Sequence, residues 1–274
     1  MRIMITDNSK LRIRFIAAFT AVICSFVMLR GICAKCFDDS ENTIKVLAYT
    51  SIGNSKGMAT AQQVENDIIY LNNKGYSPVF LSELADCINT ENDLPQKAVV
   101  LAFDGGYAQY YTEIFPLLKK YRFKADITVL GEMTEYASNS ADDNAAFLRW
   151  DEIREMEDSG VVEFSNGTYS MWDSVEFEQK SGEDYEQYRS RIVNDIDRVQ
   201  MLFQQNCGFE PNIFTYPNGK ASDYSARVVK NLGFKAAAEL GNRSVRLKGK
   251  NKTDTYRIQR YDRSEIKDIS NFFG

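Results

Sequence analysis

The chain has 274 residues, of which 44% are hydrophobic and 12% aromatic, so it is long enough to bury one large core. Its formal net charge is −5 at pH 7, and no cluster of lysine and arginine follows a turn or a helix as phosphate binding would require. These features argue against nucleic acid as a partner and favour a single globular domain.

The N-terminal segment has the pattern of an export signal. Lys10, Arg12 and Arg14 precede an uncharged apolar run, residues 15–29, which is short for a bilayer span of roughly 20 residues. The region after the run lacks a clean cleavage site, because Ile32 occupies a position that favours a small residue. Two interpretations lead, a cleaved signal peptide and an uncleaved membrane anchor formed by residues 15–29, and a wholly cytosolic protein is the third.

Either leading interpretation places the folded part outside the cytoplasm, as a secreted or extracytoplasmic protein. The acidic sequence that follows the apolar run separates it from the first expected strand. The expected organisation is a signal peptide or anchor at 1–36, a linker at 37–44 and a folded domain at 45–274.

The chain contains five cysteines. Cys33 and Cys36 have C-x-x-C spacing, but they lie beside the apolar run without a second such pair, so we do not interpret them as a metal or redox site. Cys87 and Cys207 belong to the folded part, where a disulfide and two buried thiols both remain possible.

From residue 44 onward, short apolar runs alternate with longer segments of helical periodicity. The runs are continuously apolar, which indicates strands covered on both faces in a largely parallel sheet. The expected strands are Ile44–Tyr49, Ser77–Leu81, Lys97–Phe103, Lys124–Leu130, Val161–Phe164, Asn212–Tyr216, Phe234–Glu239 and Tyr256–Arg260. The expected helices lie within residues 60–75, with Thr60 as the N-cap, and within 110–123, 149–160 and 183–205. Six to eight such units predict an α/β fold closed into a TIM-like barrel.

Three expected strands end in similar turn residues, at 104–106, 165–167 and 217–219. Each turn has a simple explanation, because Asp-Gly and Asn-Gly tolerate positive φ. Their repetition at the same end of successive strands favours a shared cleft. Aromatic side chains suited to the faces of sugar rings lie in the same loops: Tyr107, Tyr110, Tyr111, Tyr169, Trp172, Tyr216 and Tyr224.

Several segments resemble, in order, the motifs of one family. They are VLAYTSIG at 46–53, AFDGGY at 102–107, EFSNGTYSMWD at 163–173, IFTYPNG at 213–219 and YRIQRYDRS at 256–264. These segments are similar to those of the NodB-like polysaccharide deacetylases, carbohydrate esterase family 4. The resemblance implies a distorted (β/α)7 TIM-like barrel that acts on N-acetylated amino-sugar glycans of the cell wall or the extracellular space.

The family uses a divalent metal such as zinc, held by one aspartate and two histidines, with a second aspartate as base and a histidine as acid. By resemblance, Asp104 occupies the base position, whereas the metal-ligand positions hold Gly105, Gly167 and Met171. Thr50 replaces the histidine of the opening strand, and the chain has no histidine at all. We therefore expect no metal cofactor and regard Asp104 as a vestigial base.

The leading hypothesis is a catalytically degenerate deacetylase-like protein that still binds the glycan. The expected substrate-binding residues are Tyr107, Tyr169, Trp172, Tyr216, Pro217 and Asn218.

Two other hypotheses stay open. The first is an active deacetylase that uses the remaining carboxylates, for which the candidates are Asp104, Asp126, Glu163 and Asp173. The second is a protein-interaction scaffold. Two carboxylates also have simple structural explanations: Asp126 as a solvated or lysine-paired strand residue, and Asp104 as the cap of a helix beginning near Ala108.

Overall fold

The computed structural model describes residues 43–53, 55, 57–90, 94–142, 145–249 and 252–274. The expected signal or anchor segment at 1–36 and most of the expected linker lie outside these residues. The first strand begins at Thr43, two residues before the expected start of the domain. Within the described residues, no helix combines the length and the apolar character needed to cross a membrane.

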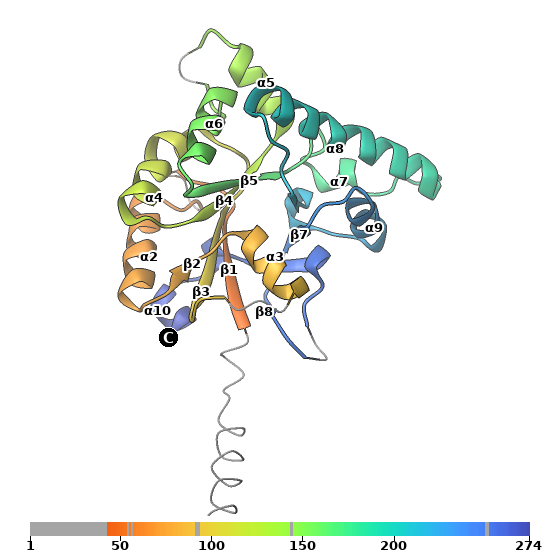
Figure 1. Ribbon diagram of the computed structural model, residues 1–274. Helices are drawn as coiled ribbons and strands as arrows, with labels where there is room; N and C mark the ends of the chain where they lie inside the picture. The colour runs from red at the N-terminus through yellow and green to blue at the C-terminus, as the bar shows by residue number, and fades with distance from the viewer. Residues whose placement is uncertain (1–42, 54, 56, 91–93, 143–144, 250–251) are drawn as a thin grey trace, which may run out of the picture. The chain divides into compact units, whose positions relative to one another are not determined.

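Seven parallel strands of the described chain close into a barrel that is surrounded by helices (Figure 1). The barrel closes because β1 pairs with β3 on one side and with β9 on the other. The expected distorted (β/α)7 barrel is therefore confirmed. In order around the barrel, the strands are β1 (Thr43–Tyr49), β3 (Ala98–Phe103), β4 (Ala125–Val129), β5 (Val162–Asn166), β6 (Ile213–Thr215), β7 (Ala236–Leu240) and β9 (Ile258–Asp262).

Two short strands extend the sheet beyond the barrel, β2 (Ser77–Pro78) and β8 (Val245–Arg246). The expected strand at 77–81 is shortened to β2, because the next helix begins at Leu81 and the Glu83 carboxylate accepts the N–H of Phe80. Strand β8 was not expected from the sequence, and it pairs antiparallel with the start of β1.

Helices cover the outside of the barrel. The expected cap of the first helix is confirmed, because Thr60 Oγ1 accepts the N–H of Gln63 at 3.1 Å. The described helices are α2 (Ala61–Asn73), α3 (Leu81–Thr90), α4 (Phe115–Tyr121), α5 (Gly131–Asn139), α6 (Trp150–Asp158), α7 (Ser174–Phe177), α8 (Tyr185–Cys207), α9 (Asp223–Asn231) and α10 (Ile269–Phe273). Short turns of helix are η2 (Tyr110–Ile114), η3 (Pro217–Gly219), η4 (Thr255–Arg257) and η5 (Arg263–Glu265).

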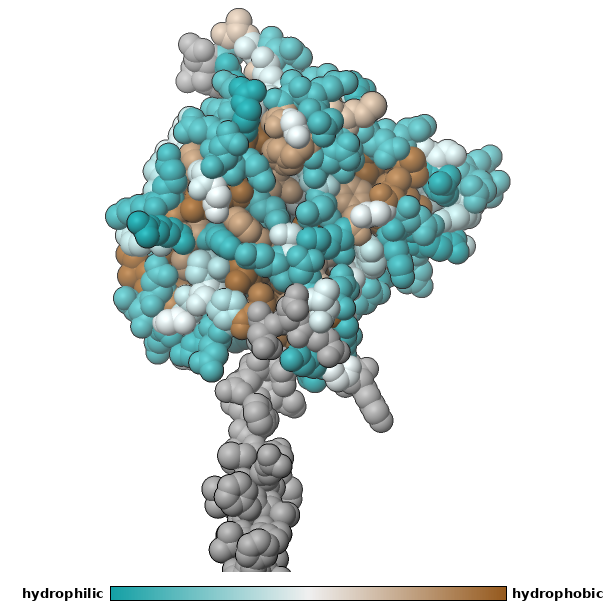
Figure 2. Space-filling view, in the orientation of Figure 1, coloured by the Kyte–Doolittle hydropathy of each residue, from teal (hydrophilic) through white to brown (hydrophobic). Residues whose placement is uncertain are grey.

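The main hydrophobic core lies between the first barrel strands and the helices outside them. Leu47, Leu101 and Ile127 of the strands are fully buried together with Ile68 of α2 and Leu118 of α4. Hydrophilic residues cover most of the described surface seen in Figure 2, and hydrophobic residues reach it in smaller areas. This packing fixes the strands whose ends carry the candidate site.

No disulfide joins Cys87 to Cys207 within the described residues. The Cys207 thiol instead lies 3.6 Å from the carbonyl oxygen of Trp150, and burial raises its pKa to about 11. The two side chains are thiols, with Cys87 buried as expected and Cys207 only partly buried.

The carboxyl group of Glu157 on α6 predicts a pH dependence of stability. Burial, with a smaller contribution from Glu163, raises its pKa to about 7 from 4.5, and its Oε2 is buried without a hydrogen-bond partner. Because the pKa of Glu157 is higher in the folded than in the unfolded protein, its contribution to the free energy of unfolding is fully present below the unfolded pKa. That contribution is lost as the pH rises through 7 and the buried group ionises.

Replacing Glu157 by glutamine should therefore raise the free energy of unfolding at pH 8 by about 2 kcal/mol and leave it nearly unchanged at pH 4. Urea denaturation at both pH values measures the difference. The matched control is Asp151→Asn, which removes an exposed carboxylate from the same helix. An unchanged pH profile in Glu157→Gln would contradict this account.

Candidate functional site

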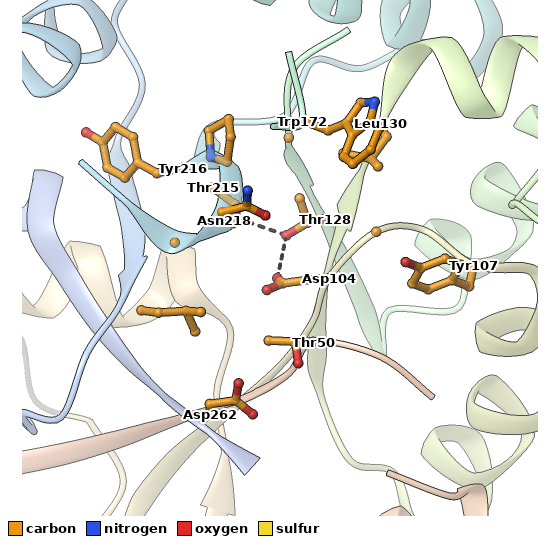
Figure 3. A pocket seen from close by; sticks show the side chains of 15 residues that line it. Thr50, Asp104, Tyr107, Thr128, Leu130, Trp172, Thr215, Tyr216, Asn218 and Asp262 are labelled. Carbon is orange, nitrogen blue, oxygen red and sulfur yellow. Dashed lines mark hydrogen bonds between the residues drawn. The ribbon is translucent and has the colours of Figure 1, made fainter. Parts of the chain in front are cut away.

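A pocket of about 340 Å³ opens at the carboxyl ends of the barrel strands (Figure 3). The structure brings together here the three strand ends with turn residues, as the sequence pattern predicts. The lining residues are Thr50, Asp104, Gly105, Tyr107, Thr128, Leu130, Gly167, Trp172, Thr215, Tyr216, Pro217, Asn218, Gly219, Leu240 and Asp262.

Asp104 follows β3, and an ion pair holds it in place. Its two carboxylate oxygens accept from the guanidinium of Arg260 on β9, at 2.5 Å for Nη1–Oδ1 and 3.1 Å for Nη2–Oδ2. The Arg260 side chain is fully buried, and that of Asp104 is 22% exposed. Among the described residues, the Asp104 carboxylate accepts hydrogen bonds from Arg260 and Thr128 rather than from a backbone N–H of the helix that begins at Ala108, so the capping explanation of Asp104 is wrong.

A chain of hydroxyl groups runs from Asp104 into the barrel. Thr128 Oγ1 lies 3.3 Å from Asp104 Oδ1, 3.0 Å from Ser165 Oγ and 2.9 Å from Thr215 Oγ1. Figure 3 marks the contacts of Thr128 with Asp104 and Thr215. At the inner end, Ser165 Oγ lies 2.9 Å from Asp126 Oδ1. The floor of the pocket is thus a hydrogen-bonded polar layer that links two carboxyl groups.

Asp126 is not the solvated or lysine-paired residue that the sequence suggested. Its side chain is fully buried in β4, and its Oδ2 has no hydrogen-bond partner among the described residues. Burial raises its pKa well above the usual value, and the neighbouring carboxylate of Glu163 raises it further. Burial and the neighbouring carboxylate thus both favour the protonated form of this group.

The two glycines expected at metal-ligand positions adopt backbone arrangements that leave little room for a side chain. Gly105 has φ of 97°, and a Cβ there would lie 2.7 Å from the ring of Tyr107. At Gly167 a Cβ would lie 2.5 Å from Thr128 Cγ2 and 2.9 Å from the carbonyl oxygen of Val129. Contacts this short do not occur around real side chains, so the local packing is built for glycine.

Most residues expected to bind sugar line the pocket: Tyr107, Trp172, Tyr216, Pro217 and Asn218. The ring of Tyr216 contributes to the wall but is 1% exposed, and its hydroxyl donates to the carbonyl of Tyr256 at 3.1 Å. Trp172 is 49% exposed at the rim, where Figure 3 shows it beside Leu130. Trp172 is therefore the pocket aromatic whose face is most available to a ligand.

The structure places two expected residues, Tyr169 and Met171, outside the pocket. Tyr169 packs against the guanidinium of Arg198, 3.5 Å from its ring centroid, and Met171 Sδ lies 3.6 Å from Arg191 Nη1. The physical reason is that Asp195 of α8 accepts the backbone N–H groups of Tyr169 and Ser170 and turns this loop toward the helix.

Several pocket residues were missed in the sequence, and Arg260 is the most important. The sequence places this arginine in an expected buried strand, and a buried guanidinium needs a carboxylate partner, so the residue could have been recognised. Thr128 and Thr215 gave no signal of their own, because threonine is common in strands. The wall also includes Leu240 and Asp262, which end β7 and β9.

Asp104 and Asp262 are the carboxylates on the described pocket wall, and the chain can supply no imidazole. Arg260 already engages both oxygens of Asp104, and Asp262 Oδ1 accepts the N–H of Ser264 at 2.8 Å. The other candidates, Glu163 and Asp173, bind the backbone at the starts of α3 and α7. Within the described residues, no group of three or more cysteine or carboxylate side chains is placed to hold a metal. This donor set does not fit a centre of one aspartate and two histidines.

Comparison with known proteins identifies related sequences. The family model described as Polysaccharide deacetylase matches residues 91–237. The poly-beta-1,6-N-acetyl-D-glucosamine N-deacetylase of Escherichia coli (strain K12) is 24% identical in an alignment 189 residues long, which covers 60% of this chain and 28% of that protein. The chain thus spans less than a third of this relative's length.

Solved structures share the fold. The de-N-acetylase from Aggregatibacter actinomycetemcomitans has a TM-score of 0.71 and 26% identity, covering 84% of this chain and 99% of that one. IcaB from Ammonifex degensii has a TM-score of 0.67 and 21% identity, covering 81% and 91%. The family match extends over more than half of the chain, and it includes the strand end that carries Asp104. The chain belongs to the polysaccharide deacetylase family.

Proposed function

We propose that this protein is an extracytoplasmic, catalytically degenerate deacetylase that binds glycans containing N-acetylated amino sugars without removing the acetyl group. The observation that carries the proposal is the state of Asp104, whose two oxygens both accept from the buried Arg260. Both oxygens therefore already have a cationic partner, and a metal ion would have to compete with the Arg260 guanidinium for them. Gly105 and Gly167 offer no donor atom beside it.

The glycan part of the proposal rests on the pocket wall and on the relatives. Trp172 presents an aromatic face at the rim, while the hydroxyls of Thr128 and Thr215 form a polar floor. An apolar face beside a few fixed polar groups suits a sugar with an acetamido substituent. The related E. coli protein is named for an N-acetylglucosamine polymer.

Replacing Trp172 by alanine should weaken the binding of chitohexaose about fivefold, because one aromatic contact contributes about 1 kcal/mol. Isothermal titration calorimetry measures the affinity. The matched control is Tyr136→Ala, since Tyr136 is an exposed aromatic on α5 that does not line the pocket. Equal affinities in the two variants, or no binding of chitohexaose by the parent protein, would refute the proposed site.

The active-deacetylase alternative draws support from the hydroxyl chain that links Asp104 to the buried Asp126, because hydrogen-bonded hydroxyl groups can pass a proton between two carboxyl groups. It predicts acetate release from chitohexaose that is lost in Asp126→Asn. The scaffold alternative predicts instead that Trp172→Ala leaves the protein's function unchanged.

The extracytoplasmic location rests on the basic residues and the apolar run at 15–29, which lie outside the described residues. Mass spectrometry of the mature protein tests it. A start after residue 29 indicates a cleaved signal peptide, an intact N-terminus in the membrane fraction indicates an anchor, and an intact protein in the cytosol contradicts the proposal.

A further inference from the structure

Among the described residues, the connection between β7 and β9 contains no α-helix. The chain passes from β7 to β9 through β8 and η4, and a hollow of about 630 Å³ lies against this connection. Glu239 and Gln259 are register partners in the two strands and line the hollow. Their chain neighbours Leu240 and Arg260 face the pocket and Asp104, so strand alternation directs Glu239 and Gln259 outward.

Basic side chains dominate this hollow. Its charged lining residues are Arg243, Arg246, Lys252, Arg257, Glu239 and Asp254. Arg257 is engaged by acidic groups, at 2.8 Å from Asp223 and 3.7 Å from Glu239. Within the described chain, the exposed side chains of Arg243, Arg246 and Lys252 form no ion pair. Four cations and two carboxylates therefore line this hollow, which gives it an excess of positive charge in a protein whose net charge is −5.

The basic hollow and the candidate site each share wall residues with another hollow. A second hollow, of about 440 Å³, shares Glu239 and Gln259 with the basic hollow. It also shares Gly219 and Leu240 with the pocket that contains Asp104. Its own wall includes Lys220, Ala221, Ser222 and Ser225, which are small or polar and suit a hydroxylated ligand. The three hollows thus share wall residues in succession, and together they are called the groove.

We propose that this groove binds an acidic glycan. An N-acetylated sugar occupies the pocket, and carboxylate or phosphate groups of the same chain lie against Arg243, Arg246 and Lys252. This inference rests on the proposed glycan-binding function and adds the charge of the ligand to it. The physical reason is Coulombic, because a cationic wall attracts anionic units and repels the ammonium groups of a deacetylated amino-sugar polymer.

The probes are three oligomers of eight units. Hyaluronan octasaccharide carries carboxylates and N-acetylglucosamine, chitooctaose carries N-acetylglucosamine without charge, and a glycerol phosphate octamer carries phosphates without sugar rings. Calorimetry with the full chain at low salt should show hyaluronan, the phosphate octamer or both binding at least tenfold more tightly than chitooctaose. The advantage should shrink at high salt, because the cations are exposed. The acidic probe that binds with the higher affinity shows whether the groove prefers carboxylate or phosphate groups.

The variant Arg243→Gln/Arg246→Gln/Lys252→Gln should no longer bind the acidic probes more tightly than chitooctaose. Its affinity for chitooctaose should stay within twofold of that of the parent protein. The control Lys74→Gln/Lys119→Gln/Lys267→Gln removes the same charge from exposed positions outside the groove and should keep the advantage. If chitooctaose binds and neither acidic probe binds more tightly, the inference fails while the proposed function stands. Equal losses in the two triple variants would also overturn it, because net charge alone would then explain the binding.

Discussion

Replacing Asp104 by alanine is expected to lower the free energy of unfolding by about 3–5 kcal/mol, because the change leaves a buried charge without its partner. Arg260 is fully buried, and its Nε already has no hydrogen-bond partner among the described residues. The two bonds from Arg260 to Asp104 supply the neutralising charge. Urea denaturation monitored by circular dichroism measures the effect.

The double variant Asp104→Ala/Arg260→Met tests the cause. It removes both charges and retains an apolar side chain in the barrel, so it should be more stable than Asp104→Ala alone by about 2 kcal/mol or more. Asp262→Ala is the matched control, because it removes another carboxylate of the pocket without breaking a described ion pair. A double variant as unstable as the single one would show that the ion pair does not explain the loss.

Replacing Gly167 by histidine is expected to cost about 3 kcal/mol rather than to restore a metal ligand. The new Cβ would lie 2.5 Å from Thr128 Cγ2 and 2.9 Å from a backbone oxygen, and a backbone oxygen cannot move aside cheaply. The combined variant Gly105→Asp/Gly167→His/Met171→His/Thr50→His should also fail to bind zinc, because Met171 lies outside the pocket.

Thermal unfolding with and without zinc measures both effects. The control is Gly160→His, whose Cβ would have no atom within 4 Å, so only the positive φ of 70° opposes it at about 1–2 kcal/mol. A Gly167→His variant as stable as Gly160→His would contradict the packing argument. Zinc-dependent stabilisation of the combined variant would show that the loops still have the geometry of a metal site.

The barrel was largely predictable from the sequence, because continuously apolar runs such as Ala98–Phe103 report burial on both faces of a strand. The predicted strand bounds were wrong where a local hydrogen bond ends an apolar run early or where a strand is very short. Glu83 accepts the N–H of Phe80 and turns the end of the expected second strand into the start of α3. Strand β8 has two residues, too few to show a periodicity.

The candidate site was predictable at the strand ends but not in its internal contacts. The position of Asp104 follows from the strand that carries it, whereas its partner Arg260 is 156 residues away in the chain. No local pattern shows which carboxylate a buried arginine will meet. The misplacement of Tyr169 has the same origin, because Asp195 of α8 orients that loop through contacts distant in sequence.

The most direct test of the account is acetate release from chitohexaose by the full chain at saturating ligand, with zinc, cobalt or manganese added in turn. The account predicts binding by calorimetry and no acetate above that in a protein-free control under any of these conditions. Acetate release that increases in proportion to protein concentration would contradict it, and would show that this pocket still hydrolyses the acetamido group.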